Sequence, residues 1–157
     1  MRTTLAKSFM ALALFNLCAA SAMAQKLNAK HPGYLKALAD LRVARYYLNK
    51  QAGEPKLREE EETSIKEIDA AIAEIQKASI DDGKSVTDVP VDANEHGSPL
   101  AKAIETIYKA QNDVGHEEEN PEVKGLRHEA LEHISHAADA AKEAHLEWLN
   151  EMKEGKK

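Results

Sequence analysis

The sequence predicts an all-α protein, an antiparallel four-helix bundle with a long loop between its second and third helices. Apolar residues recur at the three- and four-residue spacing of a helix in four separate segments. Proline or glycine marks the boundaries of these segments, and none shows the strict alternation that is typical of a strand. Four amphipathic helices in a chain of 157 residues are expected to bury their apolar faces against one another.

The first two helices are expected over residues 32–50 and from about 55 to 80. Pro32 suits the first turn of a helix, and Gly53 suits a stop just after it. The acidic run from Glu59 to Glu62 favours the positive N-terminal end of the second helix. The residues expected to face the core are Tyr34, Leu38, Leu41, Arg45 and Leu48, then Ile65, Ile68, Ile72, Ile75 and Ser79.

A loop over residues 81–98 separates these helices from the last two, which are expected over 98–114 and 120–152. A loop of this length is unusual within a compact bundle. Ser98 suits the N-cap of the third helix, and Gly125 is a weak point inside the fourth. The residues expected to face the core are Leu100, Ile104, Ile107, Gln111 and Val114, then Leu126, Ala130, Ile134, Ala137, Ala141 and Trp148.

Residues 1–24 have the features of a secretory signal peptide. Arg2 and Lys7 precede a short apolar core, and Ala22-Met23-Ala24 forms a small-x-small cleavage site. The apolar core is too short for a membrane-spanning helix of about 20 residues. We therefore expect a periplasmic or secreted protein in which residues 25–157 form a single helical-bundle domain.

Composition excludes several classes of function for the mature chain. Of the 21 Lys and Arg, two lie in the signal peptide, so 19 remain against 27 Asp and Glu, a net charge of −8. Such an acidic chain is a poor partner for nucleic acid, and no later segment is apolar enough for membrane insertion. The only cysteine, Cys18, lies in the signal peptide, which excludes disulfides, thiolate metal sites and C-x-x-C-H haem attachment.

The last helix carries four of the seven histidines. At about 100° per residue, one polar face of this helix collects two imidazoles and several carboxylates. Imidazole nitrogen and carboxylate oxygen together suit Cu, Zn or Ni ions. Two interpretations stay open, a surface chelate for a divalent metal and a solvated acidic face. The candidate metal ligands are His128, Glu132, His136, Asp139 and Glu143.

The segment His128-Glu129-Ala130-Leu131-Glu132-His133 is one residue longer than the zinc-protease motif H-E-x-x-H. Residues five apart lie about 140° apart on a helix, so its two histidines cannot hold one metal together. His133 therefore lies at the boundary of the polar face. His145 lies within the apolar stripe, where a buried histidine bonded to a carbonyl or an acid is expected. No Glu-x-x-His pattern of a di-iron bundle occurs.

Charged residues also lie beside the expected core. Arg45 falls within the inner stripe of the first helix, Arg42 lies close by, and Asp69 borders the isoleucine stripe of the second. We expect an ion pair between Asp69 and one of these arginines. Such a pair would fix the register of two helices more than it adds stability. An anionic ligand bound by the arginines is the alternative.

Two resemblances bear on function. The segment from Leu126 to His145 resembles the His-, Ala- and Glu-rich helices of small metal-binding proteins of bacterial periplasms, which bind divalent metals through exposed histidines. In that family histidines recur along the whole chain, whereas here the first three helices have none inside. The blocks His31-Pro32-Gly33-Tyr34-Leu35, Ala39-Asp40-Leu41-Arg42, Ala44-Arg45 and Ile80-Asp81-Asp82-Gly83-Lys84 resemble a family of uncharacterised secreted bacterial bundles, to which no activity is attached.

These observations predict a secreted or periplasmic bundle that binds divalent transition metals through surface histidines and carboxylates. The alternative is a non-catalytic structural or protein-interaction module of the cell envelope. We expect no enzyme, because the chain has no glycine-rich phosphate loop and no recognisable nucleophile motif. We also expect no haem, because the only methionine of the mature chain, Met152, lies near its end.

Overall fold

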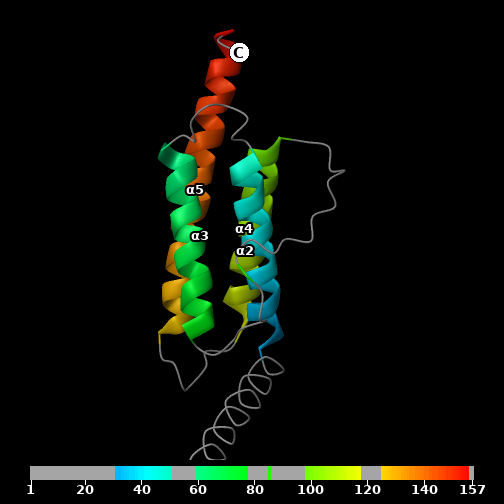
Figure 1. The fold of residues 1–157 in the computed structure, drawn as a ribbon, viewed down its shortest axis with the longest axis vertical. Helices are drawn as coiled ribbons and strands as arrows, with labels where there is room; N and C mark the ends of the chain where they lie inside the picture. Colours follow the sequence, from blue (N-terminus) through cyan, green and yellow to red (C-terminus); the bar gives the residue numbers. More distant parts are fainter. Residues whose placement is uncertain (1–30, 51–58, 78–84, 86–97, 118–124, 156–157) are drawn as a thin grey trace, which may run out of the picture.

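The computed structural model describes residues 31–50, 59–77, 85, 98–117 and 125–155, and these form an all-α four-helix bundle (Figure 1). The helices are α2 (Pro32–Lys50), α3 (Glu59–Lys77), α4 (Pro99–His116) and α5 (Leu126–Lys153). The expected signal peptide over 1–24 and nearly all of the expected loop over 81–98 lie outside the described residues.

Each helix of the bundle packs against two others. α2 contacts α3 and α4, and α5 contacts the same two helices, so the diagonal pairs are α2 with α5 and α3 with α4. Every neighbouring pair is antiparallel, as predicted, while α3 and α4 run in the same direction (Figure 1). The end of α3 and the start of α4 therefore lie at opposite ends of the bundle, which explains why a long segment separates them in the sequence.

The observed boundaries agree closely with the expected ones for α2 and α4. α3 is described over Glu59–Lys77, and the remaining residues of the expected second helix lie outside the described residues. α5 begins at Leu126 rather than near residue 120. Gly125 explains this difference, because its φ of 87° places it in the left-handed region, which glycine adopts readily. This glycine precedes the helix instead of weakening its interior. Ser98 occupies the N-cap of α4, as expected, but its side chain makes no capping hydrogen bond.

The core consists of leucine and isoleucine from α2, α3 and α4 facing an alanine-rich side of α5. The small alanine side chains let the other helices approach α5 closely, and side chains fill the space between them. The buried residues of α5 are Leu126, Ala130, Ile134, Ala137, Ala138, Ala140, Ala141 and Ala144. Ile104, Gln111 and Trp148 were expected to face the core and are only partly buried.

The expectation that Arg45 faces the core was wrong. Arg42 takes the interior position, with 1% of its surface exposed, whereas Arg45 lies half-buried at the edge between α2 and α3. A helix turns by about 100° per residue, so the step of three residues from Arg42 to Arg45 places the two side chains about 60° apart. That rotation is enough to move one of them from the interior to the rim.

Glu117 closes one end of the bundle by binding the start of α2. Its carboxylate accepts a hydrogen bond from the Gly33 backbone N–H and lies 3.3 Å from His31 Nδ1. Arg127, at the start of α5, donates to the Glu117 backbone oxygen at 2.9 Å. A carboxylate at a helix N-terminus is stabilised by unpaired backbone N–H groups there. Residues from α2, α4 and α5 are thereby joined at one point.

Candidate functional site

The five predicted metal ligands all lie on the exposed side of α5. His128, Glu132, His136, Asp139 and Glu143 are exposed, as the helical periodicity indicated. Asp139 accepts a hydrogen bond from Lys142 at 2.9 Å. Among the described residues no group of three His, Asp or Glu side chains is already arranged around one point as metal ligands. The predicted ligands therefore share one face of the helix without converging.

One of these ligands takes part in a contact with another helix. His133 Nδ1 lies 2.7 Å from Glu67 Oε2 on α3, and His136 Nδ1 lies 3.9 Å from the same oxygen. Glu67 was not predicted as a site residue. Its position between Ile65 and Ile68 places it beside the core stripe of α3, at the rim that faces α5. We call Glu67, His133 and His136 the α3–α5 cluster.

A buried hydrogen bond fixes the spacing of the two helices beside this cluster. Ser64 Oγ donates to the Ala137 backbone oxygen at 2.8 Å, one turn or less from each member of the cluster. The close approach is allowed because Ala137 and Ala141 present only methyl groups to α3. The backbones that carry the imidazoles and the carboxylate are therefore held at a defined separation.

A second acidic group, Glu74, lies farther along α3 and already has a lysine partner. Glu74 is hydrogen-bonded by Lys77, which is the main reason that its pKa is lowered; His133 also lowers it. The same hydrogen bond raises the pKa of Lys77. This arrangement differs from that of Glu67, whose partners are imidazoles.

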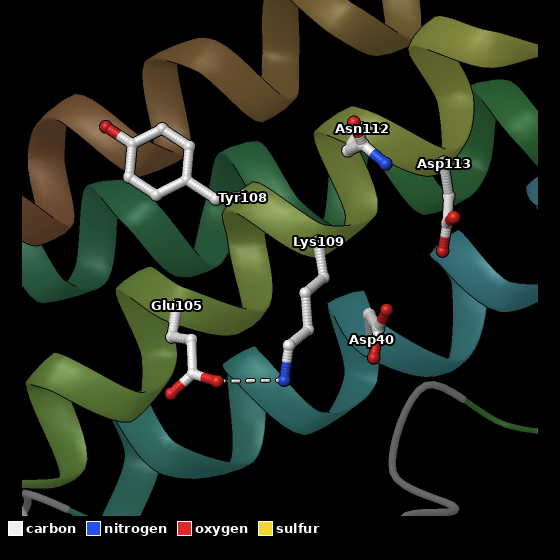
Figure 2. Close-up of a pocket in the computed structure, with 6 residues that line it drawn as sticks. All are labelled: Asp40, Glu105, Tyr108, Lys109, Asn112 and Asp113. Carbon is white, nitrogen blue, oxygen red and sulfur yellow. Dashed lines mark ion pairs between the residues drawn. The ribbon is translucent and has the colours of Figure 1, made fainter.

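A recess lies on the opposite pair of helices, between α2 and α4. It has a volume of about 340 Å³ and is lined by Asp40 from α2 and by five residues of α4 (Figure 2). In Figure 2 Lys109 extends between Glu105 and Asp40, while Tyr108 points away from them. A smaller recess of about 170 Å³ continues it along α2 past Val43 and Tyr47.

The charges in this α2–α4 groove largely neutralise one another. Burial and then the nearby Asp113 raise the pKa of Asp40, while Lys109 opposes this shift. Hydrogen bonds from Lys109 and Lys102 lower the pKa of Glu105, and the bond to Glu105 raises the pKa of Lys109. The Lys109–Glu105 ion pair measures 2.9 Å. No imidazole of the described residues lines the groove, and Glu105 forms ion pairs there with Lys102 and Lys109.

The other charged and titratable side chains singled out by the sequence, Arg45, Asp69 and His145, contact their neighbours within the bundle. Arg45 Nε and Nη2 donate to the two Asp69 oxygens at 2.7 and 3.3 Å, which confirms the expected ion pair between the first two helices. His145 is partly buried and stacks on Trp148 with the ring centres 5.8 Å apart. Its Nδ1 is buried and has no hydrogen-bond partner among the described residues, so the expected bond to a carbonyl or an acid is not seen at this nitrogen.

Comparison with protein-family models, curated proteins and solved structures finds no match to this chain. Within the described part of the chain, no helix is long and apolar enough to cross a membrane. Any functional argument consequently depends on the side chains themselves.

Proposed function

We propose that the protein is a non-catalytic helical bundle of the periplasm or the extracellular space that binds divalent transition-metal ions. The observation that carries the proposal is the concentration of imidazole and carboxylate groups along one accessible side of α5. His128, Glu132 and Glu143 are exposed there, and His136 lies close to Glu67 of α3. Cu, Zn and Ni ions favour this mixture of nitrogen and oxygen ligands.

The fold supports binding at the surface rather than in the interior. Alanine lines most of the buried side of α5, and the core of the described helices is filled by aliphatic residues and two tyrosines. Helical spacing places side chains four residues apart on the same face, so a carboxylate and an imidazole can reach one ion with little backbone movement. A rigid bundle would present such ligands at low entropic cost.

Calorimetric titration of the exported, untagged protein with Zn²⁺ or Cu²⁺ tests this proposal. We expect saturable binding that is weakened in the double variant His128→Ala/His136→Ala. His116→Ala is the matched control, because His116 lies at the end of α4 and bonds to the Asn112 backbone oxygen of its own helix. Equal affinity of the protein and its double variant would count against ligation by this face of α5.

An interaction module of the cell envelope is the second candidate function. The C-terminal part of α5 continues beyond the ends of the other three helices (Figure 1). Leu146 and Met152, in the C-terminal part of α5, are 58% and 51% exposed. A second copy of the chain is the simplest partner for this surface. Light scattering over a range of concentrations tests it: a monomer throughout would oppose self-association, and a dimer lost in Leu146→Ser would support it.

A further inference from the structure

We infer that the principal metal site lies between α3 and α5 and consists of Glu67, His133 and His136. This inference rests on the proposed metal binding and assigns it to ligands on two helices. It differs from the stripe predicted along α5 alone, with which it shares only His136. The alternative arrangement, ligation by His128 and Glu132 with His136, remains an outcome of the test.

Both histidines of the cluster approach one carboxylate oxygen. Both Nδ1 atoms approach the same carboxylate oxygen, Glu67 Oε2, at 2.7 Å for His133 and 3.9 Å for His136. The two histidines are three residues apart, so they lie one turn apart on the same side of α5. By contrast, no hydrogen bond or ion pair joins His128 to another helix among the described residues.

The two measured nitrogen–oxygen separations are close to those between neighbouring ligand atoms around a zinc ion. Zinc bonds to imidazole nitrogen and carboxylate oxygen are about 2.0–2.2 Å, which places neighbouring ligand atoms roughly 3.0–3.5 Å apart. The two measured separations lie on either side of that range. In the hydrogen-bonded state His133 is too close to Glu67 and His136 slightly too far, so the group is not yet arranged as ligands. Ligation by all three groups requires His133 to move away from Glu67 Oε2 and His136 to move toward it.

The chemistry of the group suits a site with an open position. Two imidazoles and one carboxylate are three protein ligands, and water would complete a four-coordinate zinc ion. Each imidazole must bind in its neutral form with the remaining proton on Nε2. Glu67 has no ion pair with a lysine or arginine among the described residues, unlike Glu74, which is bound by Lys77. An incoming cation therefore meets a carboxylate that only imidazoles share.

Accessibility and support also favour this position. The side chains of Glu67 and His133 are 27% and 34% exposed, and that of His136 is 58% exposed. An ion can reach them from solvent, while partial burial strengthens its attraction to the carboxylate. The Ser64–Ala137 hydrogen bond holds α3 and α5 together beside the site. Metal ligands carried by rigid helices lose little entropy on binding.

An ion held between two helices has a consequence that a chelate on one helix lacks. Binding only to the folded bundle stabilises it, because unfolding separates Glu67 from the two histidines. A chelate within α5 needs only that helix to persist. Zn²⁺ should therefore raise the melting temperature of the whole bundle, and substitution of the α3 ligand should remove most of that rise.

The test compares two conservative double variants of the exported, untagged protein. Glu67→Gln/His133→Asn removes the inferred site, and Glu132→Gln/His128→Asn removes part of the α5 stripe. Zn²⁺ affinity is measured by calorimetry, melting temperature by circular dichroism with and without Zn²⁺, and coordination by the visible spectrum of the Co²⁺ form. Metal-free melting of each variant shows whether the fold persists, and Glu67→Gln alone serves if the double variant does not fold.

We expect the first variant to lose more than about tenfold in Zn²⁺ affinity and to lose the Zn²⁺-dependent rise in melting temperature. The second should behave as the unsubstituted protein does. The reverse pattern would overturn the interhelical site while leaving metal binding by α5 intact. If the unsubstituted protein binds neither Zn²⁺ nor Co²⁺, both the inference and the proposed function are wrong.

Discussion

The two long antiparallel pairs of the bundle, α2 with α4 and α3 with α5, have similar geometry and different chemistry at their rims. In the α2–α4 groove, Lys102 and Lys109 pair with the acid Glu105. In the α3–α5 cluster, Glu67 is approached by imidazoles instead. Lysine gives a permanent charge at neutral pH, whereas a neutral imidazole offers a lone pair. The same helix packing thus yields one rim where lysines pair with an acid and one rim where imidazoles do, and only the second has the ligand types of the proposed metal site.

The comparison shows that a cluster of acids does not by itself identify a cation site. The α2–α4 groove forms a recess that includes Asp40 and Asp113, and its lysines Lys102 and Lys109 already pair with Glu105. The α3–α5 cluster has fewer charges but the ligand types that transition metals prefer. The nature of the partner of each carboxylate, rather than the number of carboxylates, separates the two regions.

The largest effect on stability is expected at the closed end of the α2–α4 pair. A Cβ atom at Gly33 would lie 2.5 Å from the Glu117 side chain and 2.7 Å from the Asp113 backbone oxygen. Gly33→Ala should therefore lower the free energy of unfolding by about 1–3 kcal/mol, because the helix ends must move apart. Denaturant unfolding measures it. Gly115→Ala is the control, since a Cβ atom added at Gly115 would have no described neighbour within 4 Å. Equal effects at the two glycines would contradict the close approach.

A smaller effect is expected from the hydrogen bond that joins α3 to α5. Ser64→Ala should lower the free energy of unfolding by about 1 kcal/mol, because a buried interhelical bond is lost. Thr106→Val is the matched control. Its hydroxyl donates at 2.8 Å to the Lys102 backbone oxygen, within α4 itself. Thermal unfolding compares them, and a larger loss for Thr106→Val would show that Ser64 does not hold the two helices together.

The ion pair between α2 and α3 should contribute less. Asp69→Asn is expected to cost about 0.5 kcal/mol, since the Arg45 and Asp69 side chains are partly solvated. A double-mutant cycle with Arg45→Met isolates the pair energy. Asp139→Asn, which breaks an exposed pair within α5, is the control and should change nothing measurable. A coupling energy of zero between Arg45 and Asp69 would remove the pair from the account of helix register.

The smallest expected effect is a pH dependence of stability that comes from the acids of the α2–α4 groove. The folded-state pKa of Asp40 is raised, so this group favours folding below its unfolded pKa and loses that contribution as the pH rises through its folded pKa. Asp40→Asn should therefore slightly raise the melting temperature at neutral pH and have no such effect in acid. Glu105→Gln should do the opposite at neutral pH, because the pKa of Glu105 is lowered. A destabilised Asp40→Asn at neutral pH would contradict the assigned environment.

Much of the fold could be predicted from the sequence because local signals determine it. Pro32 and Pro99 mark the starts of two helices, and the isoleucines of α3 mark its buried side. The exposure of His128 and His136 also follows from helical periodicity alone. These are properties of one helix considered by itself.

Contacts between helices could not be predicted in the same way. Glu67 and His133 are 66 positions apart in the chain, and their meeting depends on which helices are neighbours and at what register. The exchange of Arg42 for Arg45 in the core depends on a rotation of α2 that local periodicity does not determine to the required accuracy. The parallel direction of α3 and α4 likewise follows from the packing of all four helices.

The most direct test of the central claim, divalent metal binding through the histidines of α5, is elemental analysis of the untagged protein after dialysis against Zn²⁺ in the presence of excess Mg²⁺. The account predicts on the order of one tightly held Zn²⁺ per chain, and its loss from the triple variant His128→Asn/His133→Asn/His136→Asn. Zinc retained at the level of that variant, or none at all, would contradict it.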